Sequence, residues 1–223
     1  MKEITEMSSH ENLIEATIRL GEDTEVEDEA VVGYRGSRMV NPVLTIGDGA
    51  RIRRGTIIYV GSYIGINLET GHNVIIREEN EIGDNFRIWN NSVIDYGCRI
   101  GNNVKIHNKV YIAQKSIIED DVFIAPGVTF ANDMHPGCPE ALQCMLGPHI
   151  CRGVQIGVNS TLLPRVTVGE NTLIGAGSVV TRDLPPGIVA YGNPARVMCR
   201  LEDLNCETGL TDKPYTKLFF GVK

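Results

Sequence analysis

Three polar residues that could take part in proton transfer lie together in the segment FANDMHP, at Asn132, Asp133 and His135. An imidazole titrates close to neutral pH, so His135 could accept a proton, while the neighbouring amide and carboxylate could orient a substrate. These residues open a stretch, 131–149, that contains three prolines, which stiffen a backbone. The competing interpretation is a loop histidine without a chemical role.

An aliphatic residue recurs at every sixth position on both sides of that stretch. One series runs from Ile46 to Phe130, with Thr70 as its single polar member, and a second runs from Ile150 to Val180. A period of six fits neither an α-helix nor a continuous half-buried strand. It predicts short β segments joined by corners, where glycine and asparagine adopt left-handed backbone angles at low cost.

Such segments must stack, because one coil cannot bury its own apolar face. Stacked backbones would pair at ~4.8 Å, as neighbouring strands do. A fainter series precedes the main one and slips register by two positions before it: Ile14, Leu20, Val26 and Val32. We therefore expect the coil over 14–198, after an irregular or short helical cap over 1–13. An extension over 199–223 would follow, with its KLFFG segment covering the last coil.

The hexads resemble those of hexapeptide-repeat proteins, whose fold is a left-handed parallel β-helix. The resemblance covers roughly residues 14–200. It implies a homotrimer and three hexads in each triangular coil, so that every residue lies above the one three hexads earlier. We therefore expect an all-β, left-handed parallel β-helix with one protruding loop and a short C-terminal extension. The resemblance also implies that the loop is an arm that reaches over a neighbouring subunit.

A coil of three hexads would place His72, Asn90 and Asn108 above one another at one corner, with His107 beside Asn108 and stacked above Trp89. Successive side chains would lie one strand spacing apart, so His72 and Asn108 would be ~10 Å apart. One interpretation is a solvated corner with a structural asparagine ladder. The other is a polar wall that binds a hydroxyl-rich ligand through His72, Asn90, His107 and Asn108.

The block IGAGSVVTRDLPPGIVAYGNPARV resembles the end of the β-helix in hexapeptide acyltransferases. In that family acyl-CoA lies along the outside of the helix between two subunits, and backbone N–H groups one coil apart bind its pantetheine arm. The resemblance assigns that part to Val158 and Ala176, and the adenosine phosphates to Thr181, Arg182 and Arg196. A chain with a formal net charge of −7 needs local cations to bind so anionic a ligand. The competing interpretation of Arg196 is a surface arginine.

The segment IIEDDVFIAPGVTFANDMHP, residues 117–136, resembles the sugar-nucleotide N-acetyltransferases. His135 and the proline after it also match the sugar O-acetyltransferases, in which the histidine is the base. The first resemblance implies transfer from acetyl-CoA to the amino group of a nucleotide-linked amino-deoxy sugar, for surface polysaccharides. Asn132 and Asp133 would then orient the sugar, and His135 would assist. The alternatives are O-acetylation of a sugar hydroxyl, for which His135 would be indispensable, and a non-catalytic scaffold.

Composition argues against several other classes of protein. The 223 residues are 42% hydrophobic, enough for one core, and the negative net charge disfavours nucleic acid or an anionic membrane as partner. Apolar runs are too short for a membrane span and the start is too polar for a signal peptide, so we expect a cytoplasmic protein. The six cysteines form no CxxC pair, and the histidines lack the spacing of the γ-class carbonic anhydrases. We therefore expect free thiols and no metal.

Overall fold

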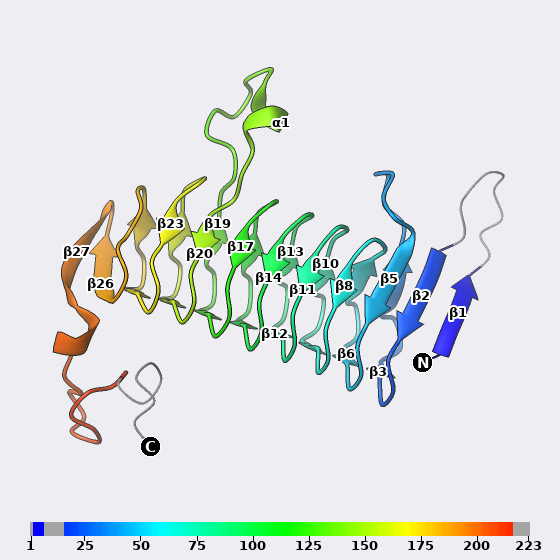
Figure 1. Cartoon of the computed structure of the whole chain (residues 1–223), viewed down its shortest axis with the longest axis horizontal. Helices are drawn as coiled ribbons and strands as arrows, with labels where there is room; N and C mark the ends of the chain where they lie inside the picture. Colours follow the sequence, from blue (N-terminus) through cyan, green and yellow to red (C-terminus); the bar gives the residue numbers. More distant parts are fainter. Residues whose placement is uncertain (1, 7–15, 216–223) are drawn as a thin grey trace.

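The chain is wound into a long coil of very short strands (Figure 1), seen in a computed structural model that describes residues 2–6 and 16–215. Three sheets run along the coil, with nine, eight and ten strands. In the body of the coil, successive strands belong to different sheets, and each pairs in parallel with the strand three places further on. This is the left-handed parallel β-helix expected from the resemblance to hexapeptide-repeat proteins.

Sheet 1 contains β1 (Lys2–Glu6), β2 (Ala16–Leu20), β5 (Val43–Ile46), β8 (Tyr63–Ile64), β11 (Glu81–Ile82), β14 (Arg99–Ile100), β17 (Ile117–Ile118), β20 (His149–Ile150) and β23 (Thr167–Val168). Sheet 2 contains β3 (Glu25–Val26), β6 (Arg51–Ile52), β9 (Glu69–Thr70), β12 (Arg87–Ile88), β15 (Lys105–Ile106), β18 (Phe123–Ile124), β21 (Gln155–Ile156), β24 (Leu173–Ile174), β26 (Ile188–Gly192) and β27 (Ala195–Arg200). Sheet 3 contains β4 (Val31–Tyr34), β7 (Ile57–Tyr59), β10 (Ile75–Ile76), β13 (Val93–Ile94), β16 (Tyr111–Ile112), β19 (Thr129–Phe130), β22 (Thr161–Leu162) and β25 (Val179–Val180). The two short helices are α1 (Ala141–Cys144) and η1 (Leu201–Asp203).

The register of three hexads per coil holds along the stack. Ile88 pairs with Ile106, and Ile106 pairs with Ile124. Across the loop the spacing grows, because Ile118 pairs with Ile150, which is further along the chain than one coil would place it. Every member of the two main six-fold series is buried, including Thr70. The core is therefore a set of columns in which like residues lie one above another.

The corners need a left-handed backbone at their third residue. Asn73, Asn91 and Lys109 show φ of 55°, 58° and 57° there, and Gly127 and Gly177 occupy the same place in later coils. Glycine and asparagine adopt this conformation at low cost, which explains why they recur at corners.

The N-terminal end differs from the expectation of an irregular or helical cap. Residues 2–6 form β1, which pairs antiparallel with β2 and covers the otherwise open edge of sheet 1. The faint six-fold series is in register, since Val26 pairs with Ile52, although Val26 is 41% exposed. Its first member, Ile14, lies outside the described residues.

At the other end, the chain leaves the coil through an antiparallel hairpin of β26 and β27. The KLFFG segment, expected to cover the last coil, lies outside the described residues. Within residues 2–6 and 16–215, no helix is long and apolar enough to cross a bilayer.

Candidate functional site

The loop projects from the corner between sheet 3 and sheet 1 and carries α1 at its far end (Figure 1). It occupies residues 131–148, one fewer than expected, because His149 already belongs to β20. Three hydrogen bonds close its base. The side-chain amide of Asn132 donates to Oε1 of Gln114, Leu146 N–H donates to the Asn132 carbonyl (3.0 Å), and Gly147 N–H donates to the Gln114 carbonyl (3.1 Å). The loop therefore leaves the coil through a fixed neck.

A local turn inside the loop sets the position of His135. Oδ1 of Asp133 accepts the backbone N–H of His135 at 2.9 Å, the pattern by which aspartate stabilises turns. The side chain of His135 is exposed, and its ring makes no hydrogen bond within the part of the chain that the structure describes. The imidazole is therefore available to bind a ligand. Asn132 and Asp133 lie beneath it at the base of the loop, where both make hydrogen bonds.

The corner between sheet 2 and sheet 3 contains an asparagine ladder. Such a ladder was one of the two interpretations of this corner that the sequence allowed. Oδ1 of Asn90 accepts the backbone N–H of His72 at 2.8 Å, and Oδ1 of Asn108 accepts that of Asn90 at 3.0 Å. The amide oxygens of both asparagines are therefore used inside the coil. This geometry favours a structural role for Asn90 and Asn108 over direct substrate binding.

The two histidines near the ladder have different surroundings. His72 is exposed, whereas the ring of His107 packs edge-on against Phe123, with centroids 5.2 Å apart. Burial lowers the pKa of His107, and the charge of Lys105 lowers it further. The imidazole of His107 is therefore neutral at physiological pH and can accept a hydrogen bond.

The ladder ends before the last coils of the same corner. Pro126 stands where the next asparagine would, and Val158 and Ala176 follow, one coil apart. Both are exposed, and among residues 2–6 and 16–215 neither backbone N–H finds an acceptor. A Cβ added to Gly157 would lie 2.5 Å from the Ala176 nitrogen, so only glycine permits this close stacking. The result is an open strip with two free donors about 4.8 Å apart, one strand spacing.

Of the three residues assigned from the sequence to the phosphates, two lie at a different corner from the strip. Thr181 and Arg182 are exposed at the corner between sheet 3 and sheet 1, so β25 separates them from Val158 and Ala176. Arg196 is exposed on β27, opposite Tyr191, whose side chain lies over Gly175 and so near the end of the strip. No acidic partner pairs with Arg182 or Arg196 in the described residues. A single chain therefore holds the expected site in separate parts: the loop, the corner of Thr181 and Arg182, and the open strip with Arg196 beyond its last member.

A polar network below the loop was missed in the sequence. The carboxylate of Asp95 accepts hydrogen bonds from Arg77 (2.9 Å) and from the Tyr111 hydroxyl (2.8 Å), and Arg77 also pairs with the almost fully buried Glu78. Burial and the Asp95 carboxylate raise the pKa of Tyr111, so the phenol keeps its proton. The feature of the sequence that could have indicated this network is that Arg77 and Asp95 are one coil apart. Because its members pair with one another, we interpret the network as structural.

Parts of the chain are similar to known proteins. The family model described as bacterial transferase hexapeptide (six repeats) matches residues 81–114, 97–132 and 147–182. Galactoside O-acetyltransferase of Escherichia coli K12 is 38% identical over 94 residues, 39% of this chain and 44% of that protein. Galactoside O-acetyltransferase of Lactococcus lactis is 34% identical over 95 residues, which are 41% of this chain and 46% of that protein. The chain thus spans less than half the length of these relatives.

Solved structures give a weaker likeness. The soybean serine acetyltransferase apoenzyme is 34% identical, with 45% of this chain and 40% of that chain covered and a TM-score of 0.40. Residues 81–132 and 147–182 thus match a hexapeptide-repeat transferase model, and acetyltransferases are among the relatives of this chain.

Proposed function

We propose that this chain is an acetyltransferase that moves the acetyl group of acetyl-CoA to a sugar. The observation that carries the proposal is the open strip at Val158 and Ala176, two exposed backbone donors one coil apart that no described residue satisfies. An extended pantetheine arm contains amides whose carbonyls accept such bonds. Arg182 and Arg196, which pair with no acidic residue among those described, supply local positive charge for phosphates on an acidic chain.

The reaction follows from the chemistry of a thioester. The acceptor nitrogen or oxygen attacks the carbonyl carbon, the C–S bond breaks, and the CoA sulfur leaves with the electron pair. The acceptor loses one proton, which His135 can take and pass to the thiolate. Asn132 and Asp133 would orient the acceptor from the base of the loop, the carboxylate through the oxygen that His135 N–H leaves free. His107 and His72 are proposed contacts at the neighbouring corner.

The first proposed acceptor is the amino group of a nucleotide-linked amino-deoxy sugar, supported by the resemblance of residues 117–136. The second is a sugar hydroxyl, supported by the galactoside O-acetyltransferase relatives. The two differ in their need for a base, since a hydroxyl must lose its proton as it attacks. Thiol release from acetyl-CoA, measured with amino-sugar nucleotides and with plain galactosides, distinguishes them. We expect His135→Ala to remove nearly all turnover with a hydroxyl and to lower it modestly with an amine.

The proposed site needs a second copy of the chain, and we propose a homotrimer. Within one chain the loop and the open strip lie at different corners of the coil. A loop from a neighbouring subunit could bring His135 to the strip. Complementation tests this arrangement: His135→Ala and Ala176→Trp would each be inactive alone, and mixed oligomers of the two would regain part of the activity. No recovery in mixed oligomers of proven composition would contradict the shared site. No turnover with any acceptor, and no thermal shift by coenzyme A, would favour the scaffold.

A further inference from the structure

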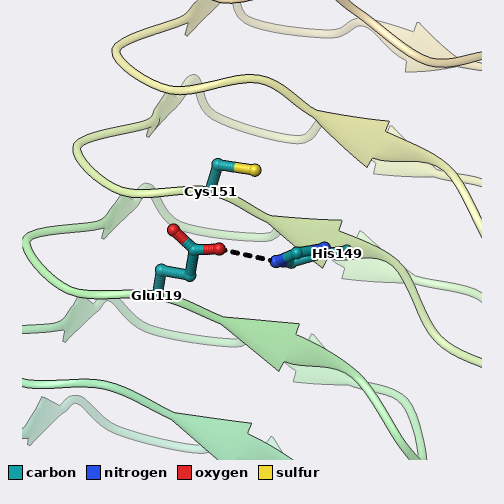
Figure 2. A group of neighbouring side chains, drawn as sticks. All are labelled: Glu119, His149 and Cys151. Carbon is teal, nitrogen blue, oxygen red and sulfur yellow. Dashed lines mark hydrogen bonds and ion pairs between the residues drawn. The ribbon is translucent and has the colours of Figure 1, made fainter.

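A cluster of three metal-ligand side chains lies on the coil, away from the residues assigned above. Glu119 follows β17, His149 begins β20, and Cys151 follows β20 one coil further on. Figure 2 shows the three side chains turned toward one another between the two coils. Nε2 of His149 lies 2.8 Å from Oε1 of Glu119, and one donor atom from each of the three residues lies within 4.8 Å of the others.

The donor set has the chemistry of a zinc site. Thiolate, imidazole and carboxylate are the three side-chain groups that bind Zn²⁺, at about 2.0 to 2.3 Å, so donors in a tetrahedral site are ~3.4 Å apart. The Glu119–His149 separation of 2.8 Å lies below that value, and the 4.8 Å upper limit on the other separations lies above it. We propose that Glu119, His149 and Cys151 bind one zinc ion or a similar divalent transition metal, with a fourth coordination position open to solvent or a small ligand.

The surroundings of Glu119 orient its carboxylate and pair the nearest positive charge with another residue. The second oxygen of Glu119, Oε2, accepts the backbone N–H of Arg152 at 2.9 Å, which fixes the direction of the carboxylate. The guanidinium of Arg152 pairs with Asp120 at 2.8 Å. Binding would release the Cys151 thiol proton to solvent, leaving a thiolate on the metal and a neutral imidazole beside it.

The cluster is also partly accessible. All three side chains are half-buried, and Glu119 and Arg152 line a shallow hollow of about 670 Å³ on sheet 1, together with Tyr63, Arg99 and Ile117. An ion can therefore reach the donors without unfolding of the coil.

The position of the cluster indicates what the metal would do. Between Glu119 and His149 the chain makes the rest of one coil and then the whole loop, and His149 is the first strand residue after the loop returns. A metal that joins these residues closes a span of 30 positions. Clips that close long spans reduce the entropy of the open chain. We infer that the ion would fasten the returning strand to the coil below and so hold the base of the loop. This role does not depend on the proposed acetyl transfer.

There is a physical reason why the sequence did not indicate this site. Paired cysteines and a three-histidine spacing can be recognised in a sequence, whereas the donors of this cluster come from two coils separated by the inserted loop. Their proximity exists only because the loop returns the chain into register, with Ile118 opposite Ile150.

The test uses the full chain, stripped of metal with a chelator and dialysed. Titration with Co²⁺, a spectroscopic substitute for zinc, should give one equivalent per chain and a thiolate-to-cobalt charge-transfer band. Cys151→Ser should abolish that band, while His149→Gln and Glu119→Gln should weaken metal binding by about tenfold or more. Cys144→Ser is the matched control, because Cys144 is an exposed cysteine on the loop outside the cluster, and it should leave the band unchanged.

Two further measurements keep the proposal falsifiable if a variant fails to fold. Zinc should raise the Tm of the wild-type chain by mass action, and X-ray absorption of that complex should show one sulfur among its ligands. A band that persists in Cys151→Ser, or a ligand shell of nitrogen and oxygen only, would overturn the proposal. So would rapid alkylation of Cys151 that zinc does not slow, since that result would indicate a thiol nucleophile beside His149 instead of a metal ligand.

Discussion

The side-chain amide of Asn132 donates a hydrogen bond to Oε1 of Gln114, the residue one coil below it. Asn132 is the last residue to keep the register of the stack before the loop leaves it. The same two residues bind the returning chain, through Leu146 and Gly147. The loop is therefore held at its base by polar contacts, while α1 at its far end has no buried residue.

Gln114→Ala should loosen this neck, because it removes the oxygen that accepts the side-chain amide of Asn132. Loss of one such hydrogen bond costs about 1 kcal/mol, and opening of the loop should become about fivefold more frequent. Limited proteolysis within residues 133–146 measures this change. Gln143→Ala is the control, because Gln143 bonds Glu140 within the α1 region and should leave the cleavage rate unaltered. Equal rates in both variants would show that the neck does not restrain the loop.

Substitutions at Asp133 should separate its structural role from a chemical one. Asp133→Asn keeps an oxygen that can accept His135 N–H, whereas Asp133→Ala removes it. We expect acetyl transfer by the alanine variant to be about fivefold below that of the asparagine variant, the effect of about 1 kcal/mol. Steady-state kinetics with the best acceptor provides the measurement. Equally low activity in both variants would mean that the negative charge itself contacts the substrate.

Asn90→Ala should lower stability and leave coenzyme A binding unchanged. The variant leaves the backbone N–H of His72 without its ladder acceptor, at a cost of about 1 kcal/mol in the free energy of unfolding. Denaturant unfolding and calorimetric titration with coenzyme A measure the two quantities. Asn90→Asp retains an oxygen acceptor, as Asp84 does at the corner between sheet 1 and sheet 2, and should keep most of the stability. Wild-type stability in Asn90→Ala would argue against the ladder.

Cys206 should be the most readily alkylated thiol at neutral pH. The hydroxyl of Thr208 and nearby backbone N–H groups lower its pKa to about 7. About half of it is then thiolate at pH 7, the fraction rises above that pH, and it falls below it. Burial instead raises the pKa of Cys98 to about 12, so this thiol should not react. Peptide mass spectrometry after brief iodoacetamide treatment measures both rates. Labelling of exposed Cys138 as fast as Cys206 would contradict the prediction.

The fold was predictable because its information is local and repeated. Each hexad carries its own inward residue, and residues such as Ile88 and Ile106 meet through a constant spacing that can be counted. The start of the chain was predicted less well. β1 pairs antiparallel with β2 outside the six-fold pattern, so no periodicity announced it.

The candidate site was predictable only in part. Counting in hexads also places Val158 and Ala176 at one corner. Whether their backbone N–H groups are free of an acceptor depends on which neighbouring residues lack an acceptor side chain. The ladder of Asn90 and Asn108 had two interpretations in the sequence, because hydrogen-bond direction is a property of side-chain geometry.

The sequence by itself determined the six-fold repeat and the place where the loop interrupts it, since these follow from a period and its break, whereas three hexads in each coil followed from the resemblance to hexapeptide-repeat proteins. Only the tertiary structure decided where the loop returns. That return lengthens one coil by an amount that is not a whole number of hexads, and it brings Glu119 beside His149 and Cys151. A spacing that is not a multiple of the repeat cannot be counted in advance, because it is set by how an irregular segment closes upon the stack.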